Sequence, residues 1–250
     1  MSQRYREPAP TRRNRGRRTT LWVLGFTVIA GLAVSPAAGR GRESSADMHL
    51  STDEPLTSYR AFRRMHAKSE RFNQEGWLSA WTEFDGQEFR YQIVDERGSE
   101  SVRNKVLRAV LKREQELVSE GVERGALTEE NYDFTETAPQ GDGMRYVLLK
   151  PKRKDVMLLE GRMVLTPDGK DLVRVEGRLA KNPSFWTSLV NVIRHFAKVD
   201  GVRVPVSTES TAKVKFAGQS RLDVSYEYES INGRPVSLAG QRMLASIATR

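Results

Sequence analysis

The side chains that most often act as general bases or metal ligands at neutral pH are histidines, and this chain has three: His49, His66 and His195. None has a partner at metal-ligand spacing, and the sequence contains no nucleophile elbow and no phosphate-binding glycine loop. His195 lies in an apolar strand-like stretch, where a hydrogen-bonded interior histidine is expected. The sequence therefore predicts no catalytic residue, no metal site and no cofactor. A carboxylate pair that only the fold brings together would leave no such pattern, so a hydrolase stays an alternative.

Aromatic side chains carry more information about binding. Seven of them are candidates for lining an apolar ligand cavity: Trp77, Trp81, Phe89, Tyr91, Trp186, Tyr226 and Tyr228. The same residues would be ordinary core residues in many proteins, because aromatic rings contribute large buried areas. Both interpretations stay open at this point, and replacing Trp77 and Trp81 with alanine would separate them.

The N-terminal segment predicts export. Seven arginines precede residue 20, an apolar run extends from Leu21 to Val34, and small residues follow in "SPAAG". This is the layout of a signal peptide, residues 1–38, with cleavage near Ala37 or Ala38. The apolar run is shorter than the roughly 20 residues of a spanning helix, which disfavours an uncleaved membrane anchor. The pair Arg17-Arg18 just ahead of the apolar run also allows a twin-arginine signal, so the export route stays open.

Removing residues 1–38 lowers the net charge from +9 to about +3, so the basic character belongs mostly to the export segment. This argues against a nucleic-acid partner. The chain has no cysteine, so its periplasmic form must be stabilised by its core without disulfides. Residues 39–55 are polar and predict a flexible leader.

The rest of the chain predicts an α+β fold with one curved antiparallel sheet around two helices. Apolar residues at helical spacing from Leu56 to Met65 predict the first helix, and a stripe from Ser101 to about Arg124 predicts the second. Asp85-Gly86 marks a hairpin, and strand patterns linked by short turns follow Arg145. The domain should cover residues 56–240, with residues 241–250 as a tail.

Two registers are open for the hairpin around Asp168-Gly169. A loop of Asp168, Gly169 and Lys170 places Arg162 opposite Glu176 and Glu160 opposite Arg178, so unlike charges meet across one face. A loop that begins at Pro167 would instead put like charges opposite each other. We predict the first register. In the next hairpin, an Asp200-Gly201 turn should place Leu189, Ile193, Ala197 and Val199 on one apolar face with Val202, Val204 and Val206.

Between about Tyr59 and Ser230 the sequence resembles proteins of the LolA/LolB-like superfamily, in particular the uncharacterised branch of outer-membrane lipoprotein-sorting proteins. The resemblance rests on "YVLLKPK", "LLEGRMVL", "LVRVEGRLAK", a Pro-Ser-Phe-Trp step, "FAKVDGVRVPV" and "SYEYE". It implies an incomplete antiparallel barrel around helices, with an apolar interior that receives acyl chains.

The leading functional hypothesis is therefore a non-enzymatic periplasmic carrier that binds a lipid or a lipidated protein, with envelope proteins as further partners. Transient membrane contact is compatible with it, and the basic run "KPKRKD" is either a solvated turn or a contact with anionic headgroups. The alternative is an envelope sensor or interaction module of the same fold, with a filled core.

Overall fold

The computed structural model describes residues 53–120, 125–138, 140–185, 187–215 and 218–248. Antiparallel strands make up most of this part of the chain. They are β1 (Tyr59–Ser69), β2 (Gln74–Phe84), β3 (Phe89–Gly98), β4 (Tyr132–Glu136), β5 (Arg145–Pro151), β6 (Leu159–Leu165), β7 (Leu172–Leu179), β8 (Thr187–Val199), β9 (Val202–Val214), β10 (Gly218–Ile231) and β11 (Arg234–Pro235).

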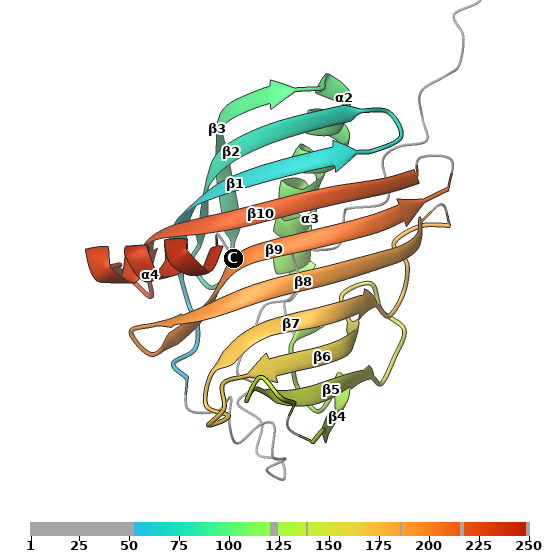
Figure 1. Cartoon of the computed structure of the whole chain (residues 1–250). Coiled ribbons are helices and arrows are strands. Elements are labelled where there is room, and N and C mark those ends of the chain that lie inside the picture. Colours follow the sequence, from blue (N-terminus) through green and yellow to red (C-terminus); the bar gives the residue numbers. More distant parts are fainter. Residues whose placement is uncertain (1–52, 121–124, 139, 186, 216–217, 249–250) are drawn as a thin grey trace, which may run out of the picture.

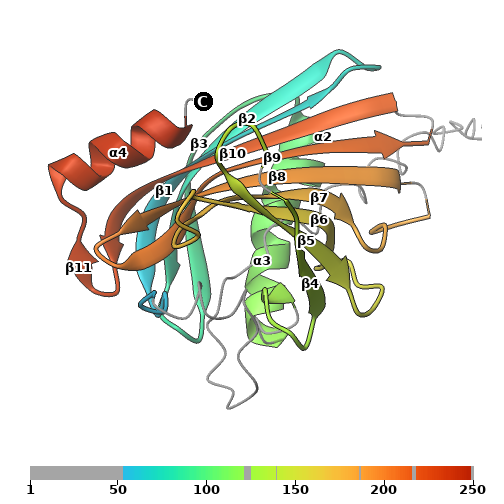
Figure 2. The ribbon, with the colours of Figure 1, turned by 60° about the horizontal axis from the view of Figure 1, so that its bottom comes forward.

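All strands belong to one eleven-stranded sheet in the order β3-β2-β1-β10-β9-β8-β7-β6-β5-β4, and β11 extends β10. The first hairpins therefore pair with the last long strand through β1 and β10. Strands β3 and β4 are the two edges, so the sheet is open. Figures 1 and 2 show it curving around the helical segment that follows β3. This confirms the predicted curved antiparallel sheet in its main outline.

The helical segment on the concave side consists of α2 (Glu100–Val102), a π-helical turn η2 (Arg103–Leu107) and α3 (Arg108–Glu120). Its buried side chains are Val102, Leu107, Val110, Leu111, Glu114 and Leu117. This face packs on the sheet, and the predicted helix from Ser101 to about Arg124 is confirmed over residues 100–120. We call the face of the sheet toward α3 the inner face and the opposite one the outer face.

The helix predicted near residues 56–70 is wrong, because residues 59–69 form β1. Its inner positions are the small Ala61 and Ala67, the charged Arg63 and the apolar Met65, and all four are buried. The alternation of apolar and polar residues typical of a strand was not visible in the sequence, because the buried position 63 is an arginine. Phe62, on the outer face, lies at helical spacing from Tyr59 and Met65 and therefore suggested a helix. The chain instead places its second helix, α4 (Leu238–Ala248), where a C-terminal tail was expected.

Helix α4 lies on the outer face, so of the two helical segments in the described part of the chain one is inside the curve of the sheet and one is outside it (Figures 1 and 2). It contacts β8, β9 and β10, and its Leu244 is 2% exposed. A Cβ added to Gly240 would lie 3.7 Å from Val199, which shows how closely the helix approaches the sheet. The apolar residues near the end of β8 and the start of β9 are therefore covered on both faces.

The predicted register of β6 and β7 is confirmed from Leu159 to Val164, and a shift then pairs Leu165 with Leu172 in place of Val173, so the predicted three-residue loop is wrong. Arg162 lies opposite Glu176, and Glu160 lies opposite Arg178, whose Nη2 is 2.9 Å from the carboxylate. Unlike charges meet in both pairs on the outer face. The loop carries Gly169 with φ of 74°, a backbone conformation that favours glycine.

The Asp200-Gly201 turn is also confirmed, with both residues at positive φ. Along β8 the expected alternation holds, because the register shift at His195/Phe196 places the extra residue in β9, where Val206 is passed over between Ser207 and Pro205. Leu189 and Ile193 lie on the outer face, and Ile193 is 36% exposed, whereas Val190 and Val192 are buried. The face of β8 that was expected to be buried is therefore the outer face, which α4 covers near the turn and which is partly exposed at Ile193. The sequence pattern did not reveal the bulge in β9.

Candidate functional site

The inner face carries a cluster of aromatic rings around a buried ion pair. Arg63 of β1 donates two hydrogen bonds to the carboxylate of Glu114 on α3, one of them at 2.8 Å. Arg63 Nη2 also donates to the hydroxyl of Tyr59 at 2.8 Å. The guanidinium carbon lies 4.7 Å from the ring centre of Tyr226 and 5.0 Å from that of Phe89. The pair thus fixes α3 over the centre of the sheet.

Four of the seven candidate aromatics belong to this inner aromatic cluster. Phe89, Tyr226 and Tyr228 are 1%, 6% and 2% exposed, and Tyr91 packs beside them with its ring 6.2 Å from that of Phe89. The hydroxyl of Tyr228 donates to the carbonyl of Pro205 at 2.8 Å. Burial raises the pKa of Tyr59 and of Tyr228, because the charged phenolate would be desolvated. These rings are core residues of the described structure.

Trp77 and Trp81 are not part of the inner cluster. Arg63 pairs with Ala80 across β1 and β2, so Ala80 points inward and the odd-numbered tryptophans of β2 point outward. Trp77 stacks on His66 with ring centres 4.8 Å apart, and Trp81 meets Phe62 edge-on at 5.2 Å. Both are half-buried. The expectation that they line the interior with Phe89 is wrong, and Trp186 lies outside the described residues.

Three arginines stand over these outer rings. The guanidinium carbons of Arg60, Arg64 and Arg97 lie 4.7 Å, 5.1 Å and 5.3 Å from the rings of Trp81, Phe62 and Trp77. Such cation–π contacts link the arginines to the rings on this face. We call this set of side chains, with His66, the outer aromatic ladder.

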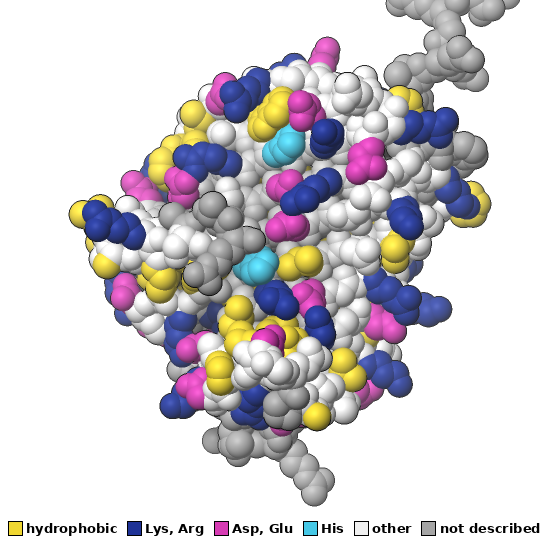
Figure 3. Space-filling view, viewed as in Figure 1, with side chains coloured by type: hydrophobic (Ala, Val, Ile, Leu, Met, Phe, Trp, Pro, Cys, Tyr) yellow, Lys and Arg dark blue, Asp and Glu magenta, His cyan; other side chains and the backbone are white. Residues whose placement is uncertain are grey.

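A depression with a volume of about 300 Å³ opens on the outer face beside the outer aromatic ladder. Six neighbouring strands contribute to it, which in their order across the sheet are β3, β2, β1, β10, β9 and β8. Its charged residues are three arginines and three acids: Arg64, Arg97, Arg221, Asp95, Glu209 and Asp223. Figure 3 shows the two histidines of the described residues on this face, with basic and acidic side chains between them.

The floor of the outer depression consists of small polar residues in one row across the sheet. Ser225 lies opposite Arg64 on one side and Ser207 on the other, and Ser207 lies opposite His195. Arg64 follows the inward-pointing Arg63, so the whole row faces outward. His195 is therefore a surface residue and not the interior histidine expected from the sequence. Partial burial, followed by the charge of Arg174, lowers its pKa.

Part of the lining is held rigidly. Arg221 Nε lies 2.8 Å and 2.9 Å from the two carboxylate oxygens of Asp223, and its Nη2 lies 2.9 Å from Glu209. The ring of His66 is fixed between Trp77 and Glu75, whose Oε2 is 3.2 Å from Nε2. This site could not be found from the sequence, because its residues come from six strands and no two of them form a motif.

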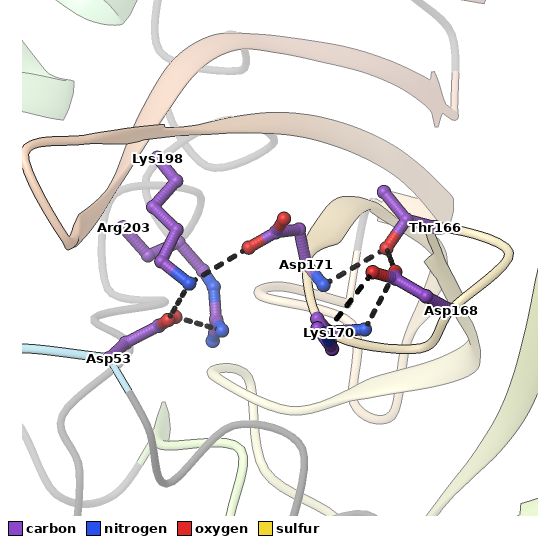
Figure 4. Close-up of polar contacts among 7 residues, drawn as sticks. All are labelled: Asp53, Thr166, Asp168, Lys170, Asp171, Lys198 and Arg203. Carbon is purple, nitrogen blue, oxygen red and sulfur yellow. Dashed lines mark hydrogen bonds and ion pairs between the residues drawn. The ribbon is translucent and has the colours of Figure 1, made fainter.

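The first described residues are anchored beside the β8–β9 turn. Asp53 is 7% exposed at its side chain and forms ion pairs with Arg203 and with Lys198, whose Nζ is 2.7 Å away. Lys198 also pairs with Asp171 at 3.0 Å, which links the anchor to the loop before β7 (Figure 4). The leader predicted for residues 39–55 is thus fixed over its last three residues, and residues 1–52 lie outside the described part.

The basic run at residues 150–155 is engaged within the protein. Lys152 donates to the carbonyl of Glu129, and Arg153 donates to Asn131. Lys150 and Lys154 are exposed. The run therefore holds the loop before β4.

Among the described residues, no group of three or more histidine, aspartate or glutamate side chains is placed to hold a metal ion. No described helix is long and apolar enough to cross a membrane.

Comparisons with known proteins add little. No protein-family model matches the sequence, and none of the curated proteins matches it. A solved structure of a DUF1329 family protein from Desulfovibrio piger is similar at a TM-score of 0.38 and 12% identity, over 72% of this chain and 88% of that chain. A likeness at that level carries no argument about function.

Proposed function

We propose that this chain is an exported, non-enzymatic binding module that has a packed core and receives its ligand or partner on the outer face of the sheet. The observation that carries this proposal is the burial of Phe89, Tyr226 and Tyr228 to 6% exposure or less around the Arg63–Glu114 pair. Space filled by these side chains is not available to an acyl chain. The periplasm as the compartment is supported by the signal-like layout of residues 1–38.

The composition of the outer face supports binding there. Tryptophan and arginine are the residues most enriched among those that dominate binding energy at interfaces. Trp77, Trp81, Arg60, Arg64 and Arg97 stand together on this face, partly exposed and ordered by mutual contacts. A module of this kind would bind another component of the cell envelope without chemical change.

An acyl-chain carrier is the second candidate, and one observation favours it. The inner aromatic cluster lies under a single helical segment, whose polar links to the sheet are few. Besides Arg63–Glu114, they include Gln115 Nε2 to the carbonyl of Phe89 at 3.1 Å and Arg108 Nε to Glu96 at 2.8 Å. If α3 moved away, the aromatic inner face would be exposed to a ligand, and each buried CH₂ would contribute about 0.8 kcal/mol.

Mass spectrometry of residues 39–250, purified from an exporting host without detergent, tests the two candidates. A mass equal to that of the bare protein, with no uptake of added palmitate or phosphatidylethanolamine, is expected for the module. A stoichiometric lipid that organic extraction removes would contradict the proposal and establish the carrier. The double variant Trp77→Ala/Trp81→Ala is the matched control, because outer-face substitutions should leave any interior lipid bound.

A further inference from the structure

The outer depression contains polar side chains that have no partner. Asp95, Arg97 and His195 form no side-chain hydrogen bond or ion pair with any residue in the described part of the chain, although Arg97 contacts the ring of Trp77. The hydroxyls of Ser79, Ser207 and Ser225 also form no hydrogen bond with a residue in the described part of the chain. Ser207 is only 9% exposed, and it lines the depression. Because this hydroxyl has no partner among the described residues and its side chain lines the depression, a ligand there can both donate to it and accept from it.

The charges around the depression restrict the chemistry of that ligand. Three guanidinium groups are balanced by three carboxylates, so neither an anion nor a cation gains a net attraction from the site. The lining of the depression is rich in charged residues, whereas charged residues are depleted at the centre of a protein–protein interface. A neutral, polar ligand fits this lining better than a charged one or an apolar protein segment.

The free groups alternate in hydrogen-bonding character. Arg97 only donates, Asp95 only accepts, and each serine hydroxyl does both. Because partial burial lowers the pKa of His195, its imidazole is neutral at pH 7 and supplies one donor and one acceptor. Sugar hydroxyls also donate and accept at once. The volume of about 300 Å³ is at the lower end of the roughly 300 to 1,000 Å³ typical of small-ligand sites.

From this geometry we infer that the outer depression is a binding site for a neutral carbohydrate, with Ser207, Ser225 and His195 at its floor and Asp95, Arg97 and the edge of Trp77 at its rim. Ligand hydroxyls would satisfy the free groups, and the fixed ion pairs of Arg221 would form a rigid wall. This inference rests on the proposed function, since it names the ligand class of the same outer face.

A titration followed by two-dimensional amide and indole NMR tests the inference. The probes are maltose, cellobiose and N,N′-diacetylchitobiose, added to folded residues 39–250. We expect at least one of them to give saturable shifts, with a dissociation constant in the millimolar range, at residues of β8, β9 and β10 and at the Trp77 indole. Inorganic phosphate is the charged control and should give no saturable shift at these residues.

Two variants localise the binding. Ser225→Leu fills the floor from the outer face and should weaken binding at least tenfold, whereas Thr211→Leu, on the same face but outside the depression, should leave it unchanged. His195→Ala serves if Ser225→Leu does not fold, with the same expected loss. No saturable shift with any of the three sugars, equal binding by the floor variants, or saturation by phosphate alone would overturn the inference.

The result is separable from the test of the proposed function. A bound lipid would contradict the packed core, but the sugar titration would still show whether the outer depression binds a carbohydrate. A failed titration with a lipid-free protein would leave the binding module in place and would direct attention to a protein partner on the outer aromatic ladder.

Discussion

Gly161 and Gly177 lie directly opposite each other in β6 and β7, and a Cβ built on Gly161 would lie 2.5 Å from the Cα of Gly177. Each glycine is the middle residue of a Glu-Gly-Arg triplet, so the two triplets pair in antiparallel register and their charges match. The close approach of the backbones requires that neither residue has a side chain.

Alanine at this pair should therefore destabilise the fold. A Cβ on Gly161 would also lie 2.1 Å from the carbonyl oxygen of Glu176, which only a backbone shift can relieve. We expect Gly161→Ala to lower the free energy of unfolding by about 1–3 kcal/mol. Gly141→Ala is the control, because nothing lies within 4 Å of its added Cβ, and it should be nearly neutral. Urea unfolding of both variants measures the difference, and equal midpoints would refute the crowding argument.

The buried pair of Arg63 and Glu114 makes a second prediction. Glu114→Ala leaves a guanidinium whose side chain is 3% exposed without its carboxylate, and it should cost about 3–5 kcal/mol of unfolding free energy. The double variant Arg63→Met/Glu114→Leu removes both charges and should recover most of that loss. A double variant as unstable as Glu114→Ala would show that the pair is needed for more than charge compensation.

Replacing an aromatic residue of β2 or β3 with alanine should destabilise the protein more on the inner face than on the outer face. Phe89→Ala removes a ring that is 1% exposed and should cost about 3–5 kcal/mol. Trp77→Ala and Trp81→Ala remove half-buried outer rings and should each cost about 1 kcal/mol, the value of one aromatic or cation–π contact. Thermal unfolding by circular dichroism makes the comparison. A large loss in the tryptophan variants would mean that the outer rings stabilise the fold as core residues do.

Stability should fall at alkaline pH because of buried tyrosines. Burial raises the pKa of Tyr132 from 10.0 to about 12, while its hydroxyl oxygen accepts a hydrogen bond from the amide of Leu159 at 3.0 Å. Below pH 10.0 both states keep the proton, and between 10.0 and about 12 only the folded state does. The stabilisation is therefore fully present below pH 10 and is lost as the pH rises toward 12, by about 2–3 kcal/mol.

Denaturant midpoints measured across this pH range, with tyrosinate absorbance in parallel, test the effect. Tyr132→Phe should start about 1 kcal/mol less stable, because the amide of Leu159 loses its acceptor, and should then lose less stability with rising pH. An unchanged slope would assign the alkaline transition to Tyr59 and Tyr228, whose pKa values burial also raises.

The anchor at Asp53 gives the fifth prediction. Asp53→Ala leaves Arg203, whose side chain is 4% exposed, without its paired carboxylate, and should cost about 3 kcal/mol. Glu130→Ala removes an exposed carboxylate on another part of the surface and should change stability by about 0.5 kcal/mol or less. Equal unfolding free energies for the two variants would show that the anchor contributes nothing to the fold.

Features of this protein that depend on local pattern could be predicted from its amino-acid sequence. The helical segment at residues 100–120, the hairpin at Asp85-Gly86, the turn at Asp200-Gly201 and the charge-matched register of β6 and β7 were all predictable. In each, neighbouring residues or directly paired strands carry the signal, because alternation, turn chemistry and cross-strand charge act over short distances.

Which face of the sheet is covered, and which side chains fill the interior, depend on contacts between residues far apart in the sequence. Arg63 made β1 resemble a helix, since its burial depends on Glu114, which is 51 positions away. His195 lies on the outer face because its neighbour Arg194 points inward, and the alternation of β2 places Trp77 on the face opposite to Ala80. The outer depression assembles residues of six strands, and only the pairing of β1 with β10 brings the two ends of the domain into one site.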